Sequence, residues 1–325
     1  MANEGSAALG ELVPAELSEL LRTQQLALRR PVWGRRHGRH QSARAGVGLD
    51  FRDHRAYVPG DDPRQLDWRA VARRDRLVLR QTEAEDELPV VLAVDVGANM
   101  GYGEGPRRKL GVARAFAGAL TWAAIRQGDS VGLVLAGDDE IDASLLRPGS
   151  GHDRLEAIAR KLVAAPAKGR APMRELLPMV APRLRRRSLF VLISDLLDFA
   201  TQVDDAHEVE QELLRGLAQL RAKNHDVVVL QVLHQDELEF PWSDSRLVRF
   251  VDRRGLREQV EGTGAGLRQR YLARIGAHLR WLDETCEAHG ILIERISTAR
   301  ALAPAFMGLL ARLAGDVEAM AAVPR

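Results

Sequence analysis

Two aspartates that follow apolar runs of strand length are the residues best suited to hold a ligand. Asp95 comes directly after residues 90–94, and Asp195 follows residues 188–193 after one serine. In an open parallel sheet, ligands collect at the carboxyl ends of the strands, where successive connections leave toward opposite faces. Mg²⁺ prefers oxygen ligands, and Asn99 adds an amide oxygen in the loop after Asp95. The sequence predicts an incomplete Mg²⁺ site of Asp95, Asn99 and Asp195; the alternative is that Asp95 only caps a helix or accepts loop amides.

The glycine-rich loop after Asp95 matches neither common phosphate-binding pattern. A G-x-G-x-x-G fingerprint that begins at Gly101 would need its last glycine at Pro106. A P-loop needs G-K-[ST], whereas Lys109 is preceded by Arg108. A flexible glycine loop is therefore favoured over a bound nucleotide.

The sequence contains no convincing catalytic set. It has no G-x-S-x-G elbow and no H-E-x-x-H pair, and its one cysteine, Cys286, is expected to be packed inside a long helix. One enzyme class stays open as an alternative. It is a Mg²⁺-dependent phosphoryl hydrolase that uses Asp95 and Asp195, with Lys109 or Arg107 holding the phosphate.

Length and composition indicate a globular α/β protein with an attached segment. The chain has 325 residues, 46% of them hydrophobic, and a net charge of +2, which excludes collagen-like and mostly disordered chains. A single cysteine cannot form an internal disulfide. The apolar runs are far shorter than the roughly 18 residues of a membrane-spanning helix, and the first residues lack the pattern of a secretory signal. We therefore expect a cytoplasmic protein with no membrane span.

The elements that must position the two aspartates are predicted from hydrophobic periodicity. Apolar runs alternate with helix-period segments from residue 89 onward, which predicts a doubly wound, mainly parallel sheet of about six strands. We expect strands at 90–94, 131–136, 143–146, 188–193, 227–233 and 291–293, helices at 109–127, 153–163, 172–180, 208–223, 267–289 and 304–313, and an edge ribbon at 246–252.

Residues 1–88 are interpreted as a separate N-terminal module, and residues 89–325 as the α/β domain. Residues 22–80 contain 15 arginines, no lysine and 6 acidic residues, a local net charge of +9. Arginines interleaved with aspartates favour bidentate ion pairs that would hold a compact irregular module onto the acidic ends of a neighbouring domain. Nucleic-acid binding is the less favoured alternative, because the aromatic residues are not spaced as a stacking platform.

The same module contains a long motif that resembles a known family. The run Gly38-x-His-x-Ser42 is followed by Gly46, Gly48 and a segment from Phe51 to Arg73. This run resembles the signature of family number 58 among the bacterial domains of unknown function, and the chain from residue 89 resembles the von Willebrand factor A-like domain that accompanies it. The signature residues that we expect to take part in binding are His40, Ser42, Arg55, Tyr57, Gly60, Asp61, Arg64, Asp67, Trp68 and Arg73.

The resemblance implies a non-enzymatic partner of MoxR-type AAA+ ATPases that helps to mature or assemble client protein complexes. It also implies a metal-ion-dependent adhesion site of the form D-x-S-x-S with a later threonine and a further aspartate. Here the first three positions are Asp95, Gly97 and Asn99, and Gly169-Arg-Ala171 stands where the threonine is expected. The site is therefore degenerate, and Arg170 could replace the ion with its own charge. Our leading hypothesis is an interaction protein without nucleic-acid binding, whose client the sequence does not name.

Overall fold

The computed structural model describes residues 10, 12–23, 50–57, 66–68, 71, 77–83, 88–184, 186–197, 206–242, 247–250 and 260–314. The chain divides into two compact units. The larger unit comprises Met1–Trp33 and Leu88–Arg325, and the smaller unit comprises Gly34–Glu87.

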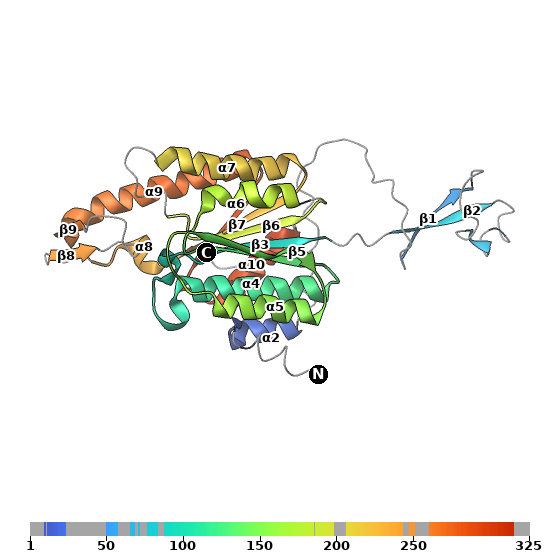
Figure 1. Cartoon of the computed structure of the whole chain (residues 1–325), viewed down its shortest axis with the longest axis horizontal. Coiled ribbons are helices and arrows are strands. Elements are labelled where there is room, and N and C mark those ends of the chain that lie inside the picture. The colour runs from blue at the N-terminus through green and yellow to red at the C-terminus, as the bar shows by residue number, and fades with distance from the viewer. Residues whose placement is uncertain are drawn as a thin grey trace. The chain divides into compact units, whose positions relative to one another are not determined.

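A six-stranded sheet forms the centre of the larger unit (Figure 1), with the strand order β10-β7-β6-β3-β4-β5. All pairs are parallel except β4 with β5. Every residue of β3, β6 and β7 is buried, as expected for parallel strands that are covered on both faces. The strands are β3 (Val90–Asp95), β4 (Val131–Gly137), β5 (Glu140–Gly149), β6 (Leu189–Ser194), β7 (Asp226–Leu233) and β10 (Leu292–Ser297).

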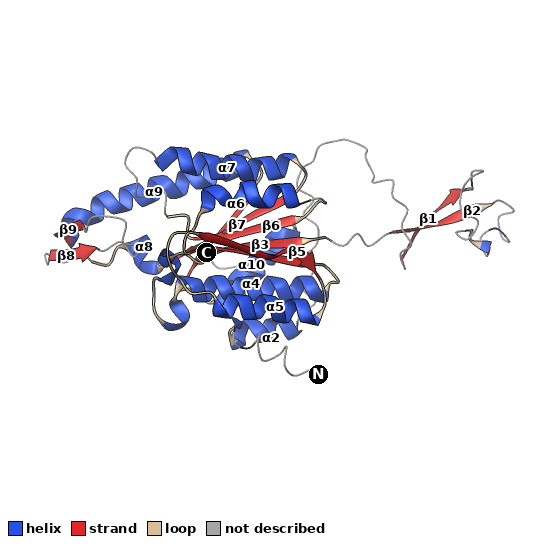
Figure 2. Cartoon of the chain, in the orientation of Figure 1, coloured by secondary structure: helices blue, strands red, loops and turns tan. Residues whose placement is uncertain are grey.

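Helices cover both faces of this sheet (Figure 2). One face packs against α4 (Lys109–Arg126), α5 (His152–Ala164) and α10 (Leu302–Ala314), and α2 (Ala15–Thr23) packs on α4 and α10. The other face packs against α6 (Met173–Val180), α7 (Ala206–Ala222) and α9 (Gly264–Ala288).

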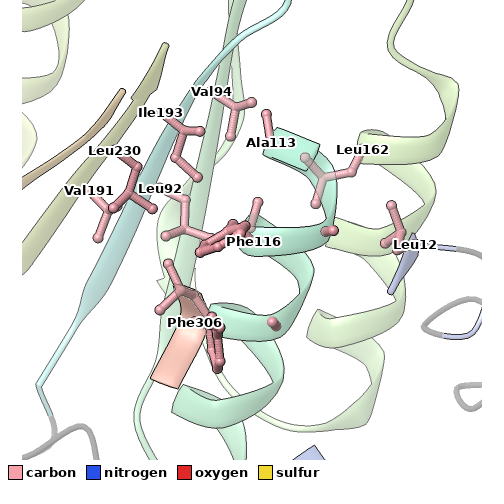
Figure 3. Packing of buried hydrophobic residues seen from close by; sticks show 14 of the residues in the cluster. Leu12, Leu92, Val94, Ala113, Phe116, Leu162, Val191, Ile193, Leu230 and Phe306 are labelled. Atoms are coloured by element: carbon pink, nitrogen blue, oxygen red, sulfur yellow. The ribbon is translucent and has the colours of Figure 1, made fainter. Parts of the chain in front are cut away.

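The core between the sheet and α4 is built around two phenylalanines. The rings of Phe116 in α4 and Phe306 in α10 meet edge to face with centroids 5.7 Å apart, and both are fully buried. Figure 3 shows them against Leu92 and its neighbours on the central strands. This packing fixes α4 on the sheet, and with it the residue at which α4 begins.

The prediction of a mixed α/β fold with about six mainly parallel strands is confirmed. Strand β5 is longer than the short run expected at 143–146, and it is antiparallel because the tight turn at Asp138 and Asp139 returns the chain beside β4. The ribbon expected at 246–252 is a separate hairpin of β8 (Leu247–Phe250) and β9 (Val260–Thr263). The short helix α8 (Gln235–Glu239) was not predicted.

The predicted module over residues 1–88 differs from the structure at its N-terminal part. Helix α2 belongs to the larger unit, because Leu17 and Leu21 are buried in the same core as α4 and α10. The backbone N–H of Leu302 donates to the Glu16 carboxylate at 3.2 Å. Val13 lies so close to Gly118 in α4 that a Cβ there would be 3.3 Å from its Cγ2.

The smaller unit contains an antiparallel strand pair. Strand β1 (Asp50–Ala56) pairs with β2 (Val78–Glu83), and the register shifts between Phe51 and Asp53. The pairing continues in the hydrogen bond from the Tyr57 N–H to the Leu77 carbonyl, at 2.9 Å. The expected irregular module therefore has a regular strand pair within its described residues.

Among the described helices, none is both long enough and apolar enough to cross a membrane.

Candidate functional site at the carboxyl edge of the sheet

The carboxyl edge, where β3, β6 and β7 end, contains the topological switch point of the sheet. Strands β3 and β6 are parallel neighbours, and the helices that follow them, α4 and α7, pack on opposite faces. Asp95 is the last residue of β3, and Asp195 follows β6 directly. The structure therefore brings both predicted aspartates to the edge where open α/β sheets bind ligands.

Both carboxylate oxygens of Asp95 accept hydrogen bonds within the protein. Oδ1 accepts from the backbone N–H of Gly97 at 2.8 Å, and Oδ2 accepts from the Ser194 hydroxyl at 2.6 Å. Asp95 is buried, and bonds of this kind stabilise a carboxylate away from water. Asp95 thus ties the loop after β3 to the end of β6, and it accepts a loop amide as the alternative interpretation expected.

Asp195 belongs to a buried ion cluster that we call the Lys109 triad: Lys109, Asp195 and Glu237. The Lys109 ammonium donates to Asp195 Oδ2 at 2.7 Å and to Glu237 Oε1 at 2.6 Å. Lys109 is 0% exposed. A buried charge is tolerated only when it is paired and hydrogen-bonded, and here one cation bridges two anions from distant parts of the chain.

The electrostatics of the triad keep Lys109 charged. Burial alone lowers the pKa of the Lys109 ammonium, but the attraction of Asp195 and Glu237 outweighs burial and raises the pKa above its usual value. Burial raises the pKa of the Glu237 carboxyl, against the opposing effect of Lys109. Lys109 is also the first residue of α4, where the helix dipole disfavours a cation, so the two carboxylates compensate for that position too.

Further hydrogen bonds hold the two carboxylates of the triad in place. Asp195 Oδ1 accepts from the Leu197 N–H at 3.0 Å, and the Gln231 amide donates to the Asp195 carbonyl at 3.0 Å. Glu237 Oε2 accepts from the His234 N–H at 2.8 Å, as part of the capping box of α8. The triad is therefore pre-organised by β7 and α8 as well as by α4 and β6.

Two tyrosines flank the triad. The Tyr102 hydroxyl donates to Asp236 Oδ2 at 2.9 Å, and its ring meets His234 edge to face with centroids 4.9 Å apart. The Tyr271 hydroxyl, from α9, donates to the Glu237 carbonyl at 3.0 Å. Burial raises the pKa of both phenols; the hydrogen bond to Asp236 adds to this for Tyr102, and the Glu237 charge adds to it for Tyr271.

We expect the phenols of Tyr102 and Tyr271 to ionise only above their usual pH range, at the pH at which the chain unfolds. The folded-state pKa values of both tyrosines and of Lys109 are raised, so the stability that these groups contribute is complete below a pH of about 10 and is lost as the pH rises through the folded-state values. An ultraviolet titration run beside circular dichroism should show phenolate formation and unfolding at the same pH, and Tyr102→Phe should remove one late phenol. Complete ionisation of a chain that still has its native circular dichroism would contradict this.

The loop after β3 places Asn99 and Gly97 near Asp95. Asn99 is half-buried in the 3-10 helix η2 (Ala98–Gly101). A Cβ added at Gly97 would lie 3.1 Å from Asp95 Oδ1 and 3.2 Å from the Ala171 nitrogen. The segment predicted to stand in place of the threonine therefore lies beside the Asp95 loop, but the space for a side chain at position 97 is tight.

Arg170, which the sequence suggested as a replacement for the ion, has a different partner. Its side chain is half-exposed and forms an ion pair with Asp139 at 3.3 Å. The neighbouring Lys168 pairs in the same way with Asp138 at 2.8 Å. These pairs hold the loop 168–170 against the β4–β5 turn, and the cation that contacts a predicted ligand is Lys109.

The residues present do not fit a divalent cation. Mg²⁺ requires several oxygen ligands in near-octahedral geometry, but all four carboxylate oxygens of Asp95 and Asp195 already accept hydrogen bonds from protein groups. One of these donors is the Lys109 ammonium, whose positive charge would repel a second cation. Among the described residues, no group of three or more His, Cys, Asp or Glu side chains is arranged to hold a metal.

The residues named for a phosphoryl hydrolase are also separated by this arrangement. Lys109 is bonded to carboxylates and lies out of contact with solvent. Arg107 is exposed at the end of the 3-10 helix η3 (Gly105–Arg107). Of the two cations named as alternatives for holding the phosphate, Lys109 is thus buried and only Arg107 is exposed.

Six of the ten signature residues lie outside the described part of the chain: His40, Ser42, Gly60, Asp61, Arg64 and Arg73. Arg55 lies in β1 opposite Leu79, and Tyr57 continues the strand pair. The Asp67 carbonyl accepts from the Val71 N–H at 2.9 Å, and Trp68 is 64% exposed.

Sequence reasoning missed Glu237, Tyr102 and Tyr271 as members of the site. Glu237 is separated from Lys109 by 128 positions, so no local spacing connects them. One signal was present: a lysine at the start of an apolar helix, after the loop that follows a strand ending in aspartate, opposes the helix dipole and is stabilised by a nearby anion. That signal predicts an ion pair for Lys109, although it does not identify the partner.

The region that is similar to known proteins includes the residues of this site. The family described as "Protein of unknown function DUF58" matches residues 53–279. Uncharacterized proteins from Mycobacterium bovis and Mycobacterium tuberculosis are each 30% identical to the chain over 234 residues, which cover 71% of this chain and 70% of each relative. A solved structure titled as an aerotolerance-related membrane protein from Bacteroides fragilis NCTC 9343, with multiple mutations to serines, aligns over 71% of this chain and 100% of that chain, at 11% identity and a TM-score of 0.40.

Proposed function

Because the chain belongs to the DUF58 family of proteins of unknown function, we propose that it is a non-enzymatic interaction protein that acts with a MoxR-type AAA+ ATPase. In this proposal the larger unit is a von Willebrand factor A-like domain, and its carboxyl edge docks the ATPase or its client during maturation or assembly of a protein complex. The mostly parallel sheet with helices on both faces is compatible with that fold.

One observation carries the proposal: the buried charged groups at the switch point are bonded to other groups of the protein. Lys109 satisfies Asp195 and Glu237, and Asp95 is satisfied by Gly97 and Ser194. A nucleophile or general base needs an accessible group within reach of a substrate. Groups locked in buried bonds are better suited to hold the shape of a recognition surface.

The surface around this edge offers charged side chains to a partner. Arg107 and Arg108 are exposed on the loop between β3 and α4. Exposed ion pairs, Asp138 with Lys168 and Asp139 with Arg170, stand on the β4–β5 side. Since Asp138 and Asp139 are already paired with cations, the two arginines favour a partner with an acidic surface.

We expect reversal of the two arginine charges to weaken capture of the ATPase. Arg107→Glu with Arg108→Glu should lower the affinity for a MoxR-type ATPase of the same organism by at least about tenfold, as for an interface hot spot. The measurement is biolayer interferometry with the whole chain. The matched control is Arg186→Glu with Lys223→Glu, two exposed cations before β6 and β7 at the opposite edge.

The control variant should bind as the unmodified chain does. Equal loss in both variants would show a general charge effect rather than docking at the carboxyl edge. Failure of the unmodified chain to bind any such ATPase would reject the proposed function.

A further inference from the structure

The Lys109 triad places a fixed positive charge at the edge where a bound cation would be expected. The ammonium lies 2.7 Å from Asp195 and 2.6 Å from Glu237, and it comes from the chain itself. We propose that the Lys109 ammonium takes the place of a divalent cation at the carboxyl edge, so that this surface is assembled without metal.

The chemistry of the donor set supports this substitution. A buried pair of carboxylates needs a cation, because two like charges close together in a poorly solvated site destabilise each other. An ammonium supplies that charge through up to three directed hydrogen bonds and needs no octahedral shell. Metal sites in such sheets also need oxygen donors from the neighbouring loops, but of the three positions here Gly97 and Ala171 have no side-chain oxygen, and only the amide of Asn99 offers one.

The local packing supports the same conclusion. The Cβ of a serine at position 97 would come within 3.1 Å of Asp95 Oδ1 and 3.2 Å of the Ala171 backbone nitrogen. A hydroxyl ligand could therefore be added only if the loop moved. The Asp95 carboxylate is instead bonded to the backbone of that loop and to Ser194.

One consequence concerns what the edge can recognise. Lys109 is out of contact with solvent, so its charge is not available to an acidic group of a partner. Lys109 is thus a positioning residue, which holds the ends of β6, α4 and α8 together beneath the exposed loop 104–108. The consequence for docking rests on the proposed function. The proposal that the Lys109 ammonium takes the place of a divalent cation does not rest on it.

The first test uses the unmodified chain and Mg²⁺ alone. Isothermal titration calorimetry at millimolar Mg²⁺ should show no saturable binding, and the melting temperature should be the same in Mg²⁺ and in EDTA. Saturable binding that is lost in Asp195→Asn would overturn the proposal. This test does not involve the ATPase, so its outcome is independent of whether the proposed function holds.

The second test asks whether a metal can take the place of the ammonium. In Lys109→Ala, Asp195 and Glu237 lose their cation and a space opens between them, so Mn²⁺ should bind at least about tenfold more tightly than to the unmodified chain. Mn²⁺ should also raise the lowered melting temperature of this variant. Lys168→Ala, which removes an exposed lysine near the same edge, should gain neither effect.

A variant that folds but binds Mn²⁺ no better than the unmodified chain would reject the idea that ammonium and metal compete for one place. Lys109→Gln keeps hydrogen-bond donors without the charge, and it serves if Lys109→Ala does not fold. In either case the Mg²⁺ measurement on the unmodified chain still decides whether the edge takes a cation.

Discussion

Replacement of Lys109 by methionine is expected to lower the free energy of unfolding by about 3–5 kcal/mol, the usual cost of removing one partner from a buried ion pair. Methionine has a similar length, so the variant leaves little empty space but removes the charge that Asp195 and Glu237 share. Urea unfolding followed by circular dichroism measures the loss. For a unit of this size it corresponds to a fall in melting temperature of about 2–4 °C for each kcal/mol.

The pH dependence of that variant provides an internal check. Burial raises the pKa of Glu237, and a carboxyl with a raised folded-state pKa contributes stability that is complete below its unfolded value, near pH 4.5, and is lost as the pH rises through the folded value. The deficit of Lys109→Met should therefore shrink in acid. Glu237→Gln added to Lys109→Met should recover part of the loss at neutral pH, because it removes one uncompensated charge.

The matched control is Lys168→Met. Its ion pair with Asp138 is exposed, and exposed pairs contribute little. Comparable destabilisation by both variants would show that the effect comes from the loss of any lysine rather than from the Lys109 triad.

Replacement of Gly169 by alanine is expected to destabilise the larger unit by about 2–5 kcal/mol. Gly169 has a φ of +59°, which costs a side-chain-bearing residue about 1–2 kcal/mol. Its Cβ would also lie 2.4 Å from the Cα of Asp138, and relief of such overpacking costs about 1–3 kcal/mol more. Because this overlap is with backbone, the loop 168–170 must move away from the β4–β5 turn.

Gly128→Ala separates the two contributions. Gly128 also has a positive φ, +84°, but a Cβ there would meet nothing within 4 Å. Gly128→Ala should therefore show only the cost of the positive φ, as a smaller decrease in the free energy of unfolding measured in urea. Equal losses in the two variants would mean that contact with Asp138 contributes nothing.

Much of the sheet could be predicted from the sequence because its central strands are buried on both faces. The runs that became β3, β6 and β7 contain almost no polar residues, so their position and type were clear without knowledge of their neighbours. Strand β5 was less clear, since it is half-exposed and pairs with β4 at the edge of the sheet.

The site was predicted only where it depends on strand ends. Asp95 and Asp195 could be assigned to one edge because parallel strands end together. The partners of Lys109 could not be identified, because Asp195 lies 86 positions away and Glu237 lies on a helix of five residues that leaves almost no periodic signal. Residues 15–23, which form α2, were included in the N-terminal module for a similar reason: no local pattern connects them to α4 and α10.

The contact between α2 and α10 has a consequence for synthesis of the chain on the ribosome. Glu16 and Leu302 are 286 positions apart, so α2 is made long before the part of α10 that it contacts. At about 5–20 residues per second, roughly 14–57 s pass between the two. During that interval the apolar side chains of α2 lack their native cover from α10, so the nascent chain presents a hydrophobic segment to which chaperones can bind until α10 has been made.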